Sequence, residues 1–598
     1  MKDRLRAHPW AVAITGLFVA LATTYSLVSP IFEVSDEFLH YPVVEHIATT
    51  GRLPVQDPNI RTMWDQEGSQ PPLYYLLGAG LTFWIDTSDL EAVRWLNPHA
   101  KLGIPLDPDN KNIIIHTAAE RFPWLGTVLA VHLIRFLSVS MGAVSVALTY
   151  TIAHEAWLGS RWIPPLAAAL VAFNPMFLFI SSSVNNDNLV ILLGTWTLLL
   201  LVRMLHDGLS TQRSVTLAVA VALGSLTKIS GLTFAPVAGL ALAVHGWRTR
   251  KWREAMATGG LILIAWAILA GWWYLRNLRL YGDLLGTQTM IAIAGGRPET
   301  NLAGLAREWY GFWVAYWALF GGVSILVDPV VYRFLSAISW AAAAGLIGWG
   351  VVTARRRAWR EFMIPGLLAM QVILTFAALI RWTLMTYGSQ GRLMFPAIGA
   401  ISALMALGLL NRLPERWQQA GAVAVGLPLL VVAAISPFRY IAPAYADPPI
   451  VDQVPEGAVP VGLSFNGFEI VAVAAESVTV EEGGRVPVTL YVRANGLLDT
   501  NYSLYLHALG RNGDEIGKID TYPGGGALPT SHMQPGAIYA DRYSLELEPE
   551  FEAPTIVRVA IGAGLRTGDQ YIILNGQMPD GSEIPSVAIH AGVAYPAD

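Results

Sequence analysis

Long apolar runs dominate the first 440 residues of the chain. A helix that crosses a bilayer needs about 20 mostly apolar residues, and the sequence offers about eleven runs near that length. They lie near residues 10–31, 126–155, 162–181, 188–204, 213–228, 229–247, 256–276, 333–353, 360–381, 393–411 and 419–438. The pattern predicts an α-helical multi-span membrane protein with about eleven transmembrane helices.

Lys and Arg gather at the turns between alternate runs, in the clusters 2–6, 248–253, 355–360 and 412–416. Cytoplasmic loops of membrane proteins are enriched in these residues. About eleven crossings place every one of the clusters on the cytoplasmic side. We therefore expect a cytoplasmic N-terminus and an extracytoplasmic C-terminus in a cell membrane, with a bacterial plasma membrane as the favoured location.

Two apolar stretches, 71–85 and 310–326, are left over. Counting either one as a full span would invert the orientation of the clusters that follow. We interpret both as interfacial or re-entrant helices on the outer face. Residues 1–440 are then a transmembrane domain with two large outer loops, 33–126 and 277–332.

The C-terminal part follows a different pattern. Short alternating runs such as 488–492 and 503–509 are separated by Asn-Gly and Gly-rich turns, which is typical of antiparallel strands. Residues 455–598 are predicted to form an extracytoplasmic all-β sandwich. Residues 441–454, rich in Pro and Asp, are the expected linker.

Composition supports a membrane protein. Hydrophobic residues make up 54% of the chain and charged residues 14%, against roughly 25% charged in soluble domains. These values exclude a disordered protein, a nucleic-acid-binding protein and a single soluble enzyme domain. The absence of cysteine excludes disulfides, thiolate metal sites and a Cys nucleophile. The net charge of −5 hides an acidic C-terminal domain, which has 7 Lys and Arg against 18 Asp and Glu from Pro455 onward.

The first outer loop opens with an acidic cluster of Glu33, Asp36 and Glu37, followed by His40. A carboxylate that faces a cavity at the membrane edge is well placed to act as general base on an acceptor hydroxyl. A loop that is merely solvated is the alternative interpretation.

Two further outer segments carry groups that suit a sugar or that organise the loops. One is a Gln-Pro-Pro-Leu-Tyr-Tyr sequence, in which Gln70 enters a short helix that Tyr74 and Tyr75 can anchor at the headgroups. The other is a loop at 181–188, which holds Asn185, Asn186 and Asp187. Helix capping explains the second segment equally well.

Several outer-face cations break the orientation trend. Arg135 lies inside an apolar run, where it needs a partner, and a first-loop carboxylate or a substrate satisfies that need equally. The others lie at outer ends of runs: Lys228, Arg276 with the neighbouring Asn277, Arg381 and Arg392. Arg and Lys are the side chains that hold phosphate. Each one singly could be a snorkelling anchor, but together they suit a lipid-linked phosphate.

Nucleotide and zinc motifs are absent from the sequence. No HExxH, no Gly-rich phosphate loop and no dinucleotide-binding Gly pattern occurs, which argues against a zinc protease, an ATPase and a nucleotide-sugar enzyme. An activated lipid-phosphate donor is the energy source that fits.

An ordered set of motifs resembles the GT-C superfamily of membrane glycosyltransferases. The chain is similar to the bacterial aminoarabinose transferase and protein O-mannosyltransferase group, from about Trp10 to Gly408. The motifs are the Asp36-Glu37 pair, Gln70-Pro-Pro-Leu-Tyr-Tyr75, Arg135-Phe-Leu-Ser-Val139, Thr227-Lys228, Trp273-Tyr-Leu-Arg276-Asn277 and Gly391-Arg392-Leu-Met-Phe-Pro396.

The resemblance implies sugar transfer from a polyprenyl-phosphate-linked donor to a glycan, lipid or protein hydroxyl. Asp36 matches the catalytic aspartate, and Glu37 would assist it or bind a metal ion if one is used. Lys228, Arg276 and Arg392 would hold the donor phosphate. Relatives often carry Lys where this chain has Gln70, so that charge is missing. The metal-using branch needs a second acidic motif, which only Asp86, Asp89 and Glu91 match loosely, so the resemblance does not require a cofactor and leaves a divalent metal as the alternative.

Two alternatives come from other classes of protein. A transporter or flippase of lipid-linked saccharides would show inverted repeats and mid-membrane charges, whereas here the charges collect on the outer face. A scaffold that only displays the β-domain leaves Asp36, Arg276 and Arg392 unexplained. Within the β-domain, the segments 520–526 and 541–543 suit either saccharide binding or turn and core packing.

Overall fold

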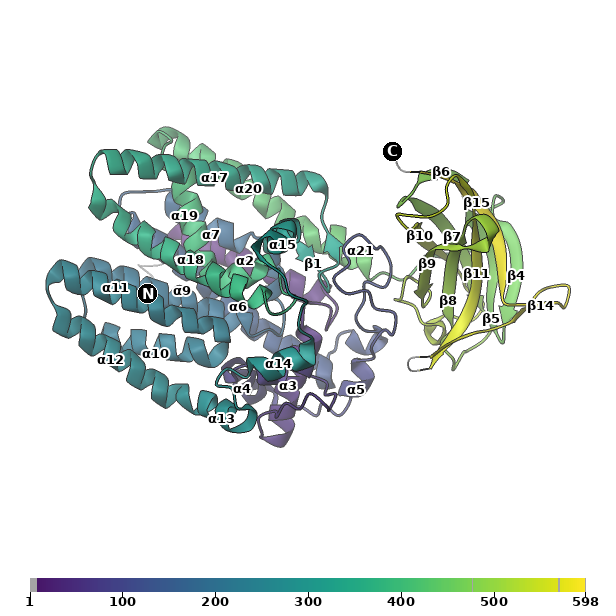
Figure 1. The fold of residues 1–598 in the computed structure, drawn as a ribbon, viewed down its shortest axis with the longest axis horizontal. Helices are drawn as coiled ribbons and strands as arrows, with labels where there is room; N and C mark the ends of the chain where they lie inside the picture. Colours follow the sequence, from purple (N-terminus) through teal and green to yellow (C-terminus); the bar gives the residue numbers. More distant parts are fainter. Residues whose placement is uncertain (1–7, 476, 568–569, 597–598) are drawn as a thin grey trace. The chain divides into compact units, whose positions relative to one another are not determined.

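The computed structural model describes residues 8–475, 477–567 and 570–596. The chain forms two compact units (Figure 1). The helical unit contains residues 1–90, 121–320 and 326–440, and the β unit contains 91–120, 321–325 and 441–598. The predicted basic cluster at residues 2–6 lies outside the described residues.

The helical unit is a bundle of long helices with shorter ones in its loops (Figure 1). Its long helices are α2 (Pro9–Val28), α6 (Gly126–Ala156), α9 (Asp187–Asp207), α10 (Thr211–Thr227), α11 (Phe234–Thr249), α12 (Trp252–Leu269), α17 (Pro329–Arg355), α18 (Met363–Thr383), α19 (Ile398–Leu410) and α20 (Glu415–Ser436). The shorter ones include α3 (Glu37–Thr50), η1 (Asp65–Ser69), α4 (Leu73–Thr82), α7 (Ile163–Ala172), α8 (Pro175–Ser181), η3 (Ile229–Thr233), α13 (Gly271–Tyr281), α14 (Thr287–Ala294), α15 (Leu302–Arg307), α16 (Trp309–Trp317) and η5 (Gly391–Ala397).

The predicted multi-span architecture is confirmed. Nine helices in the described part of the chain are long and apolar enough to cross a membrane. The predicted run 162–181 is a pair, α7 and α8, bent by 60°. The bend lies at Asn174-Pro175, where the Asn174 side chain accepts a hydrogen bond from Phe177 N at 3.0 Å and starts a new helix. The predicted run 213–228 is α10, which has only 17 residues.

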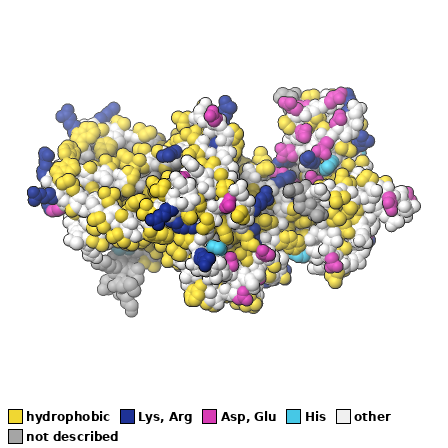
Figure 2. All heavy atoms as spheres, turned by 60° about the horizontal axis from the view of Figure 1, so that its bottom comes forward, with side chains coloured by type: hydrophobic (Ala, Val, Ile, Leu, Met, Phe, Trp, Pro, Cys, Tyr) yellow, Lys and Arg dark blue, Asp and Glu magenta, His cyan; other side chains and the backbone are white. Residues whose placement is uncertain are grey.

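The outer surface of the bundle is apolar, as a lipid-facing surface must be. Figure 2 shows hydrophobic side chains over most of the visible face of the helical unit. In α12 and α17 only 17% of the most apolar window is buried inside the protein. Ile264, Ile268 and Trp340 are large side chains on these two helices that stay exposed. Apolar patches of this extent need a hydrophobic partner, and lipid supplies it.

The two leftover apolar stretches do not form spans. Residues 71–85 contain α4, a helix of 10 residues, and 310–326 contain most of α16, a helix of 9 residues. Both are far shorter than the roughly 20 residues that a crossing needs. Their placement at the membrane interface remains a prediction.

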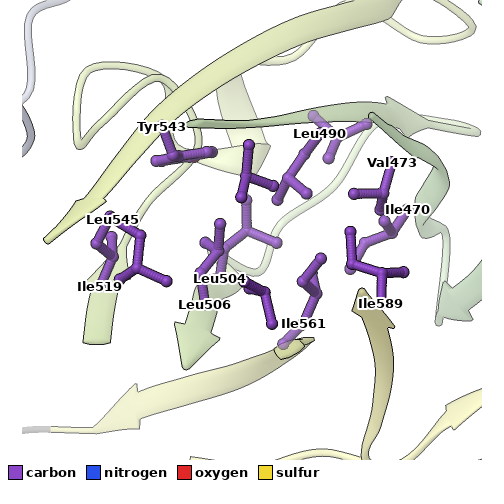
Figure 3. Close-up of a cluster of buried hydrophobic side chains, with 14 of the residues drawn as sticks. Ile470, Val473, Leu490, Leu504, Leu506, Ile519, Tyr543, Leu545, Ile561 and Ile589 are labelled. Carbon is purple, nitrogen blue, oxygen red and sulfur yellow. The ribbon is translucent and has the colours of Figure 1, made fainter. Parts of the chain in front are cut away.

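The β unit consists of two stacked antiparallel-rich sheets. Their strand orders are β14-β13-β4-β5-β7-β10-β3 and β6-β15-β11-β8-β9, with β12 paired to β11. Alternate residues of each strand point into one core, which Figure 3 shows around Leu490, Leu504 and Ile561. The strands are β3 (Ile450–Val451), β4 (Val459–Phe465), β5 (Phe468–Ala475), β6 (Val478–Glu481), β7 (Arg485–Ala494), β8 (Ser503–Leu509), β9 (Glu515–Thr521), β10 (Ile538–Glu546), β11 (Thr555–Thr567), β12 (Gln570–Ile573), β13 (Gly576–Gln577), β14 (Glu583–Ile584) and β15 (Ser586–Tyr595).

A segment of the first outer loop, 91–120, belongs to the β unit. Asn110 Nδ2 donates to Asp520 O at 3.0 Å, and Asn112 Nδ2 donates to Gly526 O at 2.9 Å. His99 Nε2 is 2.8 Å from Ser503 Oγ. These side chains are buried, so each bond also removes the cost of an unpaired polar group. The segment is therefore an integral part of the β unit.

A Gly-rich turn at 523–526 receives this segment. Gly524, Gly525 and Gly526 all have positive φ values. Asp541, which is 2% exposed, accepts a hydrogen bond from Gly524 N at 2.7 Å and another from the Tyr543 hydroxyl. The carboxylate and the tyrosine thus hold the turn. Asp541 and Tyr543 therefore have a structural role in this turn.

Replacing Gly526 with alanine is expected to loosen the docked segment. The φ of +101° is costly for any other residue, by about 1–3 kcal/mol, and a new Cβ would lie 2.7 Å from side-chain atoms of Asn97, Asn110 and Asn112. Hydrogen exchange and limited proteolysis of 91–120 measure the loss of protection. Gly581→Ala is the matched control, because Gly581 has φ +85° but open space around it. Equal protection of 91–120 in both variants would contradict the prediction.

Candidate functional site

Asp36 stands at the entrance of α3, eight residues after α2 ends. It is the N-cap residue, with φ 65°, a left-handed conformation that Asp tolerates better than most residues. Its side chain is 40% exposed and forms an ion pair with Arg392. The predicted base is therefore both paired with a cation and accessible.

Arg392 is positioned by the short helix η5. The preceding Gly391 packs so closely on α16 that a Cβ would lie 2.2 Å from Phe312 O. The guanidinium, only 4% exposed, donates from Nε to Gln390 Oε1 at 2.6 Å, from Nη1 to Asp187 Oδ2 at 3.4 Å and from Nη2 to Asp36. Such a fixed fork is the particular capability of arginine.

Asp187 joins Arg392 to a second cation. It is the first residue of α9, and its backbone N donates to Asn185 Oδ1 at 2.9 Å. Lys228, where α10 ends, donates from Nζ to Asp187 Oδ1 at 2.6 Å. Four predicted residues thus form one continuous row, Asp36–Arg392–Asp187–Lys228, which we call the charged row.

Glu67, on η1, is a member of this site that the sequence did not reveal. Its Oε2 lies 3.5 Å from His40 Nδ1, which is also 2.7 Å from the Tyr75 hydroxyl. Both partners are predicted site residues, and all three side chains are buried. The only local signal was an acidic turn just before the Gln70 motif.

The pKa values of Asp36 and Glu67 are shifted in opposite directions from the usual values of these side chains. Burial alone would raise the pKa of Asp36, but Arg392 and the other nearby cations outweigh it, so this pKa lies below its usual value. Burial, together with the negative charges of Asp36 and Asp187, raises the pKa of Glu67 to about 7. Burial lowers the pKa of His40 to about 3, which leaves the imidazole neutral.

Glu37 and Arg135 form a separate, fully buried ion pair. Arg135 Nε donates to Glu37 Oε1 at 2.9 Å, and its Nη1 donates to Ser26 O and Ser29 O at 2.7 and 2.9 Å. Glu37 also accepts from Val184 N at 2.7 Å. Both side chains are 0% exposed and satisfy each other's charge, so the predicted roles of Glu37 in catalysis and of Arg135 in phosphate binding stay predictions without support from this geometry. Partnership with a first-loop carboxylate, the structural alternative for Arg135, is what the structure shows.

The loop-organising candidates surround the site. Tyr74 OH lies 2.8 Å from Ser138 Oγ and accepts a hydrogen bond from Asn185 N at 3.1 Å, so it ties α4 to α6 and to the 181–188 loop. Gln70 and Asn186 are buried. Among the described residues, Gln70 Oε1 and both polar atoms of the Asn186 side chain have no hydrogen-bond partner.

Three predicted phosphate ligands make no recorded contact with the charged row. Arg276 donates to Pro54 O at 2.6 Å and stacks over Trp273, with 4.9 Å from its Cζ to the ring centroid. It lies on α13, which is separate from the span α12. Asn277 reaches towards Leu284 O at 3.5 Å, and Arg381 is exposed near the end of α18.

No group of three His, Asp or Glu side chains that could hold a metal ion occurs in the part of the chain that the structure describes. The charged row instead consists of two carboxylates that alternate with two cations. That arrangement suits an anion beside a proton acceptor better than it suits a cation.

Comparison with known proteins relates part of the chain to a family of sugar transferases. Residues 124–274 match the family model of dolichyl-phosphate-mannose-protein mannosyltransferases. No curated protein matches the chain. The match covers 151 of the 598 residues and agrees with the predicted resemblance to the protein O-mannosyltransferase group.

Solved structures with similarity include ArnT from Cupriavidus metallidurans bound to undecaprenyl phosphate. It has 15% identity and a TM-score of 0.39 over 73% of this chain and 74% of that one. The oligosaccharyltransferase of Archaeoglobus fulgidus has 15% identity and a TM-score of 0.41 over 70% and 53% of the two chains.

Proposed function

We propose that this protein is a membrane glycosyltransferase that transfers a sugar from a polyprenyl-phosphate-linked donor to a hydroxyl of an extracytoplasmic glycan, lipid or protein. The observation that carries the proposal is the charged row, in which the accessible Asp36 pairs with Arg392 and Asp187 links Arg392 to Lys228. Arg and Lys are the side chains that typically hold phosphate. The family match supports the transfer chemistry.

Each group of the row receives a role that its geometry permits. Asp36, with an exposed side chain, orients the acceptor hydroxyl and weakens its O–H bond as the acceptor oxygen attacks the anomeric carbon. Lys228 has one ion pair for three N–H donors and is 17% exposed, so it can also bind a phosphate oxygen. Arg392 positions Asp36, which orients the acceptor, and Asp187, which pairs with the phosphate-binding Lys228.

The site is proposed to face the outside of the cell. Lys228 immediately precedes the span 229–249, which ends at the basic turn 248–253, and Arg392 lies at the start of the span 391–410, which ends at Arg412. In both spans the site residue and the basic turn are at opposite ends. Basic turns are cytoplasmic by the positive-inside rule, so the charged row opens on the outer face.

A transfer assay tests the function. Purified protein receives a panel of undecaprenyl-phosphate-linked sugars and hydroxyl-bearing acceptors, and mass spectrometry detects the product. Transfer to the acceptor together with release of undecaprenyl phosphate is expected. Donor binding without transfer, combined with movement of the lipid between leaflets of protein-containing vesicles, would replace the proposal with a flippase.

A further inference from the structure

Glu67 is the carboxyl group of the site that lacks a cationic partner. Asp36 and Asp187 both pair with Arg392, and Asp187 pairs with Lys228 as well. The contacts recorded for Glu67 are different. Its Oε1 accepts a long 3.4 Å bond from Gln66, and its Oε2 faces neutral His40 at 3.5 Å. Oε2 is buried with no hydrogen-bond partner among the described residues.

The charge balance of the site makes this carboxyl group sensitive to a bound anion. Asp36 and Asp187 already neutralise the two cations of the charged row, and Glu67 is a third carboxyl group without a cation. A phosphate monoester such as undecaprenyl phosphate brings about −1.5 to −2 further charge beside groups of which only Asp36 is substantially exposed. The charged and titratable groups that act on Glu67 are Asp36, His40, Tyr75, Asp187, Lys228 and Arg392. Helix α14, which also packs against η1, contributes none, because its sequence has no titratable side chain.

We propose that Glu67 takes up a proton when the site binds the phosphate of a polyprenyl phosphate, and that this uptake allows the charged row to hold the added negative charge. The inference rests on the proposed function, because it needs the phosphate at the row. Asp36 cannot serve in this way, since Arg392 holds it ionised. His40 cannot, because its buried ring stays neutral.

The pKa of Glu67 is consistent with the proton uptake that the geometry of the site suggests. A value of about 7 in the free site means that Glu67 is mostly ionised at pH 8. Like charges that share a site disfavour each other's ionised forms, so a bound phosphate raises this pKa further. The bound state then carries more protons than the free state, and by linkage the affinity falls as the pH rises above 7.

Calorimetry with undecaprenyl phosphate as the probe measures the uptake. Titrations at pH 8 use two buffers with different ionisation enthalpies, so that the heat of buffer ionisation reveals the protons exchanged. At this pH a phosphate monoester is already a dianion, so the lipid is not expected to release a proton itself. An uptake of about half a proton or more per bound lipid is expected for the wild type, together with a several-fold loss of affinity between pH 7 and pH 9. Each full proton taken up corresponds to a tenfold change in affinity per pH unit.

Variants assign the proton to Glu67. Glu67→Gln keeps the shape of the side chain and is expected to bind the lipid with no proton uptake and a flat pH dependence. Glu91→Gln, at an exposed position of the α5 helix (Leu90–Val93) in the same outer loop, is the matched control and should retain the uptake. Binding of the wild type without uptake, or uptake that survives in Glu67→Gln, overturns the inference but leaves the proposed function standing. If the wild type does not bind the lipid at all, the proposed function fails and the inference falls with it.

Discussion

Replacing Arg135 with leucine is expected to destabilise the helical unit by about 3–5 kcal/mol, the cost of leaving one member of a buried ion pair without its partner. The variant leaves the Glu37 carboxylate, which is 0% exposed, buried without its cationic partner. It also removes the donors to Ser26 O, Ser29 O and Pro30 O. Those carbonyls belong to the C-terminal turn of α2 and the residues just after it, which have no helical partner of their own.

Unfolding of the detergent-solubilised protein measures this loss, and a double-mutant cycle separates its parts. Glu37→Leu combined with Arg135→Leu removes both charges, so it should recover part of the stability. The matched control is Arg203→Leu, because Arg203 pairs with Glu155 with side chains 40% and 23% exposed, and exposed pairs contribute about 0–1 kcal/mol. Equal losses for Arg135→Leu and Arg203→Leu would rule out the structural role of the buried pair.

The long spans could be predicted from the sequence because apolar length is a local property. The bend inside 162–181 is also local, since Asn174 followed by Pro175 is a start signal for a new helix. The docking of 91–120 on the β unit could not be predicted. Its polar side chains, such as Asn110, find partners about 400 residues away, and nothing in the local pattern marks them as buried.

In the candidate site, too, some residues could be identified from local sequence and others depend on contacts that only the fold supplies. Lys228 and Arg392 were identified because cations on the outer face contradict the orientation trend, and Asp187 was identified as one of several polar groups in its loop. Which residues contact one another was beyond the pattern. Arg276 and Arg381 have the same local signal as Lys228 but make no recorded contact with the charged row. Glu67 has almost no signal, because its importance comes from a burial and a neighbour, His40, that only the fold supplies.

Asp36→Asn is expected to lower the transfer rate by about 100- to 10,000-fold, the usual contribution of a positioned acid–base group. The amide keeps the size of the side chain but loses its negative charge, so it neither attracts the acceptor proton nor pairs with Arg392. Donor binding should change much less than the rate, since the Lys228 contact with Asp187 remains. Single-turnover transfer and lipid binding, measured on the same preparation, separate the two effects.

Asp57→Asn is the matched control for this loss. Asp57 lies in the same outer loop, where its Oδ1 accepts a hydrogen bond from Asn59 N at 2.9 Å, a turn contact that an amide oxygen preserves. The control should transfer sugar at the wild-type rate. A rate for Asp36→Asn within a few-fold of the control would remove Asp36 from the proposed role in proton abstraction. Another group of the charged row would then have to orient the reacting hydroxyl. In that case Asp36 would serve only as the electrostatic partner of Arg392, keeping the guanidinium in place for the phosphate.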